Sequence, residues 1–527
     1  MTSHTVLVSD SLGAAGMARL AAESDVEVID GSGLDRAGVL AAAARADALI
    51  VRSGTTVDLE LFEAAPNLRV VGRAGVGVDN VDLDAATRRG VMVVNTPRAN
   101  TVATAEQTMA LMLAATRCTA AAHRSLAEGK WDRKSFTGVD LAGRTLGVVG
   151  FGRIGREVAA RARAFGMEVI AFDPYVSEVI GRDHSVLLVE FDELLEQADV
   201  VTLHAIPPAD GSALIGADEI ASMRPGGVIV NAARGQLLDA AAACAALDAD
   251  HLRAVAVDVF DVEPPPPDHP LVGHPRVVHT PHLGASTIEA QRDVSLQVAD
   301  EVLAGLRGET MSSCVNVPFL FDTETEAQLG LAEAMGRVQR AMADGPITQV
   351  DVEVSDDRDE LLPMLAAGVL AGVLHDAGSE LVNFVSAPAI AEEHGIKVTQ
   401  GRGLGTRDYP NLMSCRVSWG SGSRIVSGVV FGGKEPRIVQ VSDYQLDARP
   451  EGTILLMLNE DLPGVVGEVG TLLGEHGVNI AEWRLGRSGE TGLALSFINL
   501  DAMADDETMQ ALRGVAAVQK AEVLRLD

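Results

Sequence analysis

The first three hundred residues alternate short apolar runs with alanine-rich stretches. The apolar runs, rich in valine, isoleucine and leucine, predict strands, and the stretches between them, such as residues 34–46, predict helices. This alternation is typical of parallel sheets that carry helices on both faces. The strands predicted in the first hundred residues cover 4–9, 26–29, 48–51 and 70–72.

A second set of strands follows a long helical pattern over residues 102–122. Six strands with intervening helices make one complete doubly wound unit. We therefore predict an α/β fold with two Rossmann-like parallel sheets. The six strands are expected at 145–149, 168–171, 200–204, 228–232, 254–259 and 277–279.

The remaining two hundred residues have a different pattern. Residues 317–449 are rich in glycine and combine two Ala/Leu-rich helical stretches with alternating runs such as 424–431, which indicates an α+β domain. Residues 452–527 follow the order β-α-β-β-α-β, the ferredoxin-like plan.

The amino-acid composition and charge limit the classes of partner that the protein can bind. The formal net charge of −32 repels nucleic acid and anionic lipid, so we expect neither as a partner. An anionic substrate would need a local basic pocket. The four cysteines are far apart and show no metal-ligand spacing, and no apolar run reaches the length of a membrane span. We expect a cytoplasmic protein with small-molecule ligands and no metal.

The segment 145–173 reads TLGVVGFGRIGREVAARARAFGMEVIAFD. Gly150, Gly152 and Gly155 form GxGxxG between a strand and a helix, and the next strand ends at Asp173. These glycines permit the tight turn, the approach of the pyrophosphate and close helix packing, respectively. The helix start favours phosphate. Because Asp173 can accept hydrogen bonds from the ribose hydroxyls and repels a 2′-phosphate, the cofactor is predicted to be NAD.

The glycine fingerprint and four further blocks resemble, in the same order, the signature phrases of the D-2-hydroxyacid dehydrogenases. The resemblance implies hydride transfer from a 2-hydroxy acid to NAD, with Arg234, Glu263 and His282 as the catalytic trio. The four further blocks are GRAGVGVDNVDLDAATRRGVMVVNTP (72–97), NAARG (231–235), VDVFDVEP (257–264) and TPHLGAST (280–287).

Residue chemistry supports the same three roles. Oxidation of an alcohol needs a base for the hydroxyl proton, and histidine, with an ordinary pKa of about 6.5, is suited to it. A carboxylate on the other ring nitrogen of His282 would fix its tautomer, the role expected of Glu263. Arg234 follows a strand end, where ligands of doubly wound sheets bind, and its planar fork can hold a carboxylate. The expected cofactor contacts are Gly150, Gly152, Arg153, Ile154, Gly155, Asp173, Ala232, Ala233, Arg234, Asp258, His282, Gly284 and Ala285.

Within this family, the long-form phosphoglycerate dehydrogenases carry phrases like Arg-Ser-Gly at 52–54 and Arg-Ala-Gly at 73–75. The resemblance implies D-3-phosphoglycerate as substrate and oxidation at the entry to serine synthesis. Two guanidinium groups suit a phosphorylated anion that the acidic protein otherwise repels. The residues expected to line the substrate pocket are Arg52, Arg73, Asn100, Thr101, Arg234 and His282.

The phrase LNEDLPGVVGEVGTLLGEHGVNIAEWRL (458–485) resembles the amino-acid-binding ACT domain. The resemblance implies that Asp461 and Asn479 hold an amino-acid effector, L-serine, across an interface between subunits. Asn459 stands where the family often has histidine or tyrosine. A homo-oligomer is expected, with a tetramer favoured.

The resemblances divide the chain into four domains. These are a substrate-binding domain (1–98 with 286–315), an NAD-binding domain (99–285), an intervening domain (316–450) and an ACT domain (451–527). Three alternatives stay open: another D-2-hydroxyacid dehydrogenase of the glycerate or glyoxylate type, an NAD-sensing corepressor, and an amino-acid sensor. The first alternative is disfavoured by Arg52, Arg73 and the ACT-like C-terminal domain. The same C-terminal domain disfavours the second alternative. The third is disfavoured by the intact catalytic trio.

Overall fold

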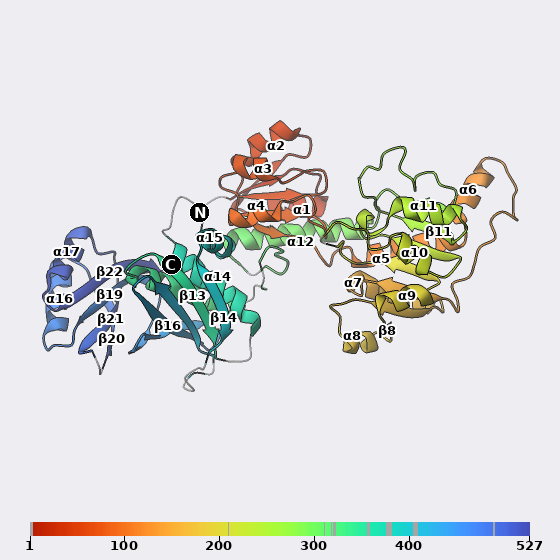
Figure 1. The fold of residues 1–527 in the computed structure, drawn as a ribbon. Helices are drawn as coiled ribbons and strands as arrows, with labels where there is room; N and C mark the ends of the chain where they lie inside the picture. Colours follow the sequence, from red (N-terminus) through yellow and green to blue (C-terminus); the bar gives the residue numbers. More distant parts are fainter. Residues whose placement is uncertain are drawn as a thin grey trace. The chain divides into compact units, whose positions relative to one another are not determined.

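The computed structural model describes residues 4–208, 210–309, 311–317, 319, 323–355, 359–375, 382–403, 409, 411–488 and 491–526. They form four sheets and divide into two compact units (Figure 1). One unit comprises residues 1–12, 18–95 and 298–527, and the other comprises residues 13–17 and 96–297. No helix among the described residues is long and apolar enough to cross a membrane.

The first sheet is fully parallel, with the strand order β2-β1-β3-β4-β5, which is the flavodoxin-like doubly wound order. All four predicted strands are confirmed. Alternate side chains such as Leu49 and Val51 contact helices on one face, and Gly72 lies close to Val298 and Val302 of α12 on the other. The strands are β1 (His4–Val8), β2 (Val26–Asp30), β3 (Ala48–Val51), β4 (Val70–Arg73) and β5 (Met92–Val94), and the helices are α1 (Ala14–Ala21), α2 (Arg36–Ala43), α3 (Leu59–Ala64), α4 (Leu83–Arg88) and α12 (Ile288–Arg307).

The second sheet is also parallel, in the order β12-β11-β10-β9-β6-β7-β8. The six predicted strands are confirmed, and the two-residue β8 adds a seventh. Neighbouring residues of β10 point to opposite faces of the sheet: Val228 packs towards α5 (Thr101–Thr116) and α7, whereas Ile229 packs towards α9, α10 and α11. The strands are β6 (Thr145–Val149), β7 (Glu168–Phe172), β8 (Leu187–Leu188), β9 (Val200–Leu203), β10 (Gly227–Asn231), β11 (Leu252–Val257) and β12 (Val277–His279), and the helices are α7 (Arg153–Ala164), α8 (Glu178–Asp183), α9 (Phe191–Gln197), α10 (Ala217–Ser222) and α11 (Ala240–Asp248).

The single helix predicted over residues 102–122 is wrong. The chain forms α5 (Thr101–Thr116) and α6 (Thr119–Ala127), separated by Cys118 with a left-handed φ of 54°. The returning Val139 N–H donates to the Thr116 carbonyl at 2.9 Å, and this carbonyl would otherwise extend the helix. Helix α6 has no buried residue, so no core holds it in line with α5.

The C-terminal part of the chain contains a mixed and an antiparallel sheet, in the orders β14-β13-β15-β16-β17-β18 and β20-β21-β19-β22. The two sheets share one hydrophobic core, because Ile454 and Leu456 pack into the cluster that contains α13, while Leu455 and Met457 pack against α16 and α17. The predicted β-α-β-β-α-β order is confirmed. The mixed part contains α13 (Thr323–Met342), β13 (Ile347–Val354), α14 (Leu362–Leu374), α15 (Ala387–Glu393), β14 (Lys397–Arg402), β15 (Met413–Trp419), β16 (Gly422–Phe431), β17 (Glu435–Val441) and β18 (Tyr444–Ala448). The last part contains β19 (Gly452–Glu460), α16 (Val465–Glu475), β20 (Ile480–Arg487), β21 (Leu493–Leu500), α17 (Asp506–Gly514) and β22 (Val518–Leu526).

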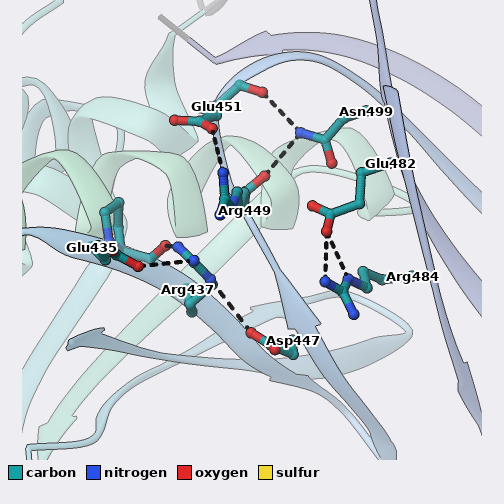
Figure 2. A network of polar contacts seen from close by, with 9 residues as sticks. Glu435, Arg437, Asp447, Arg449, Glu451, Glu482, Arg484 and Asn499 are labelled. Carbon is teal, nitrogen blue, oxygen red and sulfur yellow. Dashed lines mark hydrogen bonds and ion pairs between the residues drawn. The ribbon is translucent and has the colours of Figure 1, made fainter. Parts of the chain in front are cut away.

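The connection between these two sheets is also held by polar contacts. Figure 2 shows Asn499 of β21, whose Nδ2 donates to the carbonyls of Arg449 at 3.1 Å and Glu451 at 3.0 Å. Arg437 pairs with Asp447 at 3.4 Å across β17 and β18. The connecting residues are therefore anchored at both ends.

Candidate active site

The turn between β6 and α7 has the geometry expected of a dinucleotide site. Gly150 has a φ of 93°, and a Cβ on it would lie 2.5 Å from the carbonyl of His204. A Cβ on Gly155 would lie 2.2 Å from the Gly150 oxygen. A Cβ on Gly152 would meet nothing within 4 Å. The first and third glycines are thus required by packing, and the second leaves open space at the start of α7 for a pyrophosphate.

Asp173 follows β7 and lies beside this turn. Its Oδ2 accepts the Phe151 N–H at 2.8 Å, and its Oδ1 accepts the Tyr175 N–H at 2.9 Å. Each carboxylate oxygen has a second lone pair that can accept a ribose hydroxyl. The donor set of turn, helix start and carboxylate therefore fits NAD.

Glu263 and His282 form a close pair. With the imidazole proton on Nδ1, His282 donates to Glu263 Oε2 at 2.6 Å, and the Phe260 N–H donates to Oε1 at 3.1 Å. Burial acts to raise the pKa of Glu263, but these hydrogen bonds and the charges of His282 and Arg234 outweigh it, so the pKa is lowered. The side chain of His282 is 50% exposed, which leaves Nε2 accessible to a substrate.

Arg234 follows the end of β10, and its positive charge acts on the carboxylate of Glu263. Asn231 shapes its turn, because its Nδ2 donates to the Arg234 carbonyl at 2.8 Å and its Oδ1 accepts the Ala233 N–H at 3.1 Å. A Cβ on Gly235 would lie 1.9 Å from the carbonyl carbon of Phe260, so only glycine permits this approach. The predicted trio is therefore brought together from three loops.

Asp258, predicted as a cofactor residue, has no exposed surface. Its Oδ1 accepts the Leu283 N–H at 2.8 Å and the Thr280 hydroxyl, and its Oδ2 accepts the Gly284 N–H at 2.7 Å. The backbone N–H of His282, whose φ is 54°, donates to the Asp258 carbonyl at 2.8 Å. Asp258 thus fixes the loop that carries His282.

Gln107 of α5 was missed in the sequence. Its Nε2 donates to Thr280 Oγ1 at 3.1 Å and lies 3.4 Å from Asp258 Oδ1, behind the His282 loop. No motif marks this residue, and only its position on the inner side of α5 relates it to the site. The other predicted cofactor residues lie at helix or strand ends of the same unit: Arg153 and Ile154 begin α7, Ala232 and Ala233 follow β10, and Gly284 and Ala285 follow β12.

The predicted substrate residues outside the trio lie in two places, the start of α5 and the edge of the first sheet. Asn100 precedes Thr101 at the start of α5 without a side-chain capping bond, and its Oδ1 is buried and has no hydrogen-bond partner among the described residues. Arg52 follows β3, and Arg73 ends β4 opposite Val51. Both arginines therefore stand at the carboxyl edge of the first sheet. The Arg73 guanidinium lies over Gly75, where a Cβ would be 1.6 Å from Nη1.

The predicted effector residues lie at opposite ends of the last sheet. Asp461 follows β19, whereas Asn479 precedes Ile480, which pairs with Leu500 at the far end. At about 3.3 Å per strand residue, the nine-residue β19 separates them by roughly 25 Å. Asn479 Nδ2 donates to Asp501 Oδ2 at 2.6 Å. A single chain does not bring the pair together.

Comparison with known proteins identifies three regions. Residues 109–284 match the NAD-binding domain of D-isomer specific 2-hydroxyacid dehydrogenases, residues 326–442 the D-3-phosphoglycerate dehydrogenase intervening domain, and residues 453–517 the ACT domain.

Similarity to individual proteins extends over the whole chain. The D-3-phosphoglycerate dehydrogenase of Mycobacterium tuberculosis is 40% identical over the full length of both chains, and that of Archaeoglobus fulgidus is 38% identical over 96% of this chain and 97% of its own. Among solved structures, a glyoxylate reductase from Paecilomyes thermophila is 32% identical, with a TM-score of 0.55, over 60% of this chain and 99% of that chain.

Proposed function

The chain belongs to the D-3-phosphoglycerate dehydrogenases, the NAD-dependent oxidoreductases of serine biosynthesis, and we propose that Arg234, Glu263 and His282 carry out its chemistry. The observation that supports this most is the Glu263–His282 hydrogen bond of 2.6 Å beside the positive charge of Arg234. The substrate would be D-3-phosphoglycerate and the product 3-phosphohydroxypyruvate.

Each member of the trio has one task. NAD, when bound, supplies the acceptor for the hydride that leaves C2 of the substrate. Nε2 of His282 takes the proton of the C2 hydroxyl, because Nδ1 is committed to Glu263. The carboxylate of Glu263 holds the ring orientation and stabilises the imidazolium that forms. Arg234 binds the C1 carboxylate and polarises the C2 oxygen.

The phosphate group is assigned to Arg52 and Arg73. They stand on neighbouring strands at one sheet edge, and the net charge of −32 means that a local pair of cations must attract a phosphorylated acid. Replacing either arginine with alanine is expected to raise KM for D-3-phosphoglycerate by about 10- to 100-fold, the size of a lost charge-assisted contact. KM for D-glycerate, which lacks the phosphate, should change much less. Steady-state kinetics with both substrates measure the difference.

Arg45→Ala provides the matched control for this experiment. Arg45 is an exposed arginine of the same domain whose ion pair is with Glu27, so both KM values should stay at wild-type levels. An equal rise of KM for both substrates in the Arg52 and Arg73 variants would place these arginines outside the phosphate pocket.

The ACT domain supports an amino-acid effector, for which we propose L-serine. Because Asp461 and Asn479 lie at opposite ends of one sheet, a complete site needs two modules related by a twofold axis, each providing one end. Asp461 would take the ammonium group, and Asn479 the carboxylate and hydroxyl. Helix α6, with no buried residue, and Trp131, 81% exposed, offer a second self-pairing surface. Two different twofold interfaces make a tetramer.

Serine is expected to inhibit turnover, and Asp461→Ala and Asn479→Ala are each expected to weaken its binding at least tenfold while kcat stays unchanged. The coupling between serine and the substrate should be about 1–3 kcal/mol, which is typical of allosteric enzymes. Titration calorimetry measures the binding and initial rates measure the inhibition.

Glu522→Ala serves as the control for the effector site. Glu522 is a carboxylate of the same sheet that pairs with Arg513 at 3.0 Å on the strand farthest from β20. The proposed site is refuted if the heat of serine binding is the same in the Asp461 and Asn479 variants as in the wild type.

A further inference from the structure

The loop that carries Arg52 is held by two side chains from other parts of the first sheet. Asp10 follows β1, and its Oδ2 accepts the backbone N–H groups of Arg52 at 2.6 Å and Thr55 at 3.1 Å. Asn80 belongs to the segment before α4, and its Nδ2 donates to the carbonyls of Arg52 and Thr55, both at 2.6 Å. Both ends of the loop are therefore fixed by hydrogen bonds on both sides of the backbone.

The surrounding residues fit this arrangement closely. Thr55 Oγ1 donates to Asp10 Oδ1 at 2.9 Å. A Cβ on Gly54 would lie 2.8 Å from the same oxygen, so the loop lies directly against the carboxylate. Asn80 is itself anchored, because its carbonyl accepts the Val57 N–H at 2.8 Å. None of these contacts involves the Arg52 guanidinium, which is left available for another group.

We propose that Asp10 and Asn80 are positioning residues for substrate specificity: they hold the backbone of residues 52–55 so that Arg52 is oriented in advance for the substrate's phosphate. This inference rests on the proposed role of Arg52. An arginine on a free loop loses conformational freedom each time it binds an anion, and an arginine on a fixed backbone loses less. The two positioning residues thus act on affinity for the phosphorylated acid, through Arg52.

The test uses Asn80→Ala and Asp10→Asn in the full-length enzyme. Asn80→Ala removes the donor of two carbonyls, and Asp10→Asn places an amide NH₂ against backbone or hydroxyl donors. Each variant is expected to raise KM for D-3-phosphoglycerate about tenfold, the size expected when two hydrogen bonds are lost. KM for D-glycerate and kcat should stay within about twofold of wild type. Thermal unfolding shows whether the variants are folded.

A double-mutant cycle with Arg52→Ala separates positioning from a general structural effect. If Asn80 acts through Arg52, then Asn80→Ala should raise KM no further in the Arg52→Ala background. Additive effects in the double variant, or equal effects on both substrates, would overturn the inference.

Asn316→Ala is the matched control, because this asparagine of the same unit also bridges backbone groups, but away from Arg52. At the start of β5, its Nδ2 donates to the Val91 carbonyl at 2.9 Å and its Oδ1 accepts the Val93 N–H at 2.9 Å. It should lower stability without changing KM. If Arg52→Ala raises KM equally for D-3-phosphoglycerate and D-glycerate, the proposed phosphate pocket fails. If Arg52→Ala raises KM selectively for D-3-phosphoglycerate but Asn80→Ala and Asp10→Asn do not, the positioning inference alone fails.

Discussion

Replacing His282 with alanine is expected to lower kcat by about 10²- to 10⁴-fold, the usual contribution of a general base. NAD affinity should stay near wild type, because the imidazole acts only on the reacting hydroxyl. The pKa of Glu263 is lowered, so its carboxylate stays charged in mildly acidic solution and keeps its hydrogen bond to His282 there. Initial rates and NAD-binding titrations test the two expectations.

A nearby histidine provides the control for this measurement. His279 ends β12 three residues earlier, and its Nε2 accepts the Gly273 N–H at 3.4 Å without touching the trio. His279→Ala should keep both kcat and NAD affinity at wild-type values. Wild-type turnover in His282→Ala would end the assignment of the base.

The second large effect is expected at Asp258. Asp258→Ala would leave the buried N–H of Gly284 without its acceptor and would remove the acceptor of the partly buried Thr280 hydroxyl and Leu283 N–H, at a cost of up to about 1–3 kcal/mol for each. We expect Tm to fall by roughly 10 °C, at about 2–4 °C per kcal/mol. We also expect kcat to fall about 10²-fold, because a catalytic group displaced by about 1 Å costs that much. Calorimetry and initial rates below the lowered Tm give the two quantities.

Asp239→Ala distinguishes these two effects of Asp258. Asp239 is the capping carboxylate of α11, where it accepts the N–H groups of Ala241 and Ala242 at 2.9 Å. Its loss should cost about 1 kcal/mol of stability and leave kcat unchanged. If Asp258→Ala lowers Tm but keeps kcat, Asp258 stabilises the loop without positioning His282.

The predicted parts of the fold are those that a local pattern determines. The strand at 48–51 was found where its apolar run predicted it, because a strand buried on both faces needs an uninterrupted apolar run. The break at Cys118 was missed, because its cause is the Val139 N–H, which lies 21 residues later in the chain. Strand β8 has only two residues and is too short to produce a pattern.

The residues of the candidate active site also divide into those that a contiguous phrase reveals and those that depend on distant parts of the chain. The glycine fingerprint and the blocks around Arg234 and His282 are recognisable as contiguous phrases, and the loops that carry the trio do meet. Asp10 and Gln107 could not be recognised, because each holds a backbone or side chain that is distant in sequence. Asn80 lies inside the block at 72–97, but the phrase does not show that this residue holds the backbone of Arg52 and Thr55.

The hydrophobic core shared by the mixed sheet and the ACT sheet has a consequence for protein engineering. Because Ile454 and Leu456 pack into the same cluster as α13, the regulatory module cannot be exchanged at residue 451 as a self-contained cassette. A chimera that receives its ACT sheet from another enzyme would bring apolar side chains shaped for a different α13. Grafts with a new effector response should therefore transfer residues 323–526 as one piece, with the junction placed after α12.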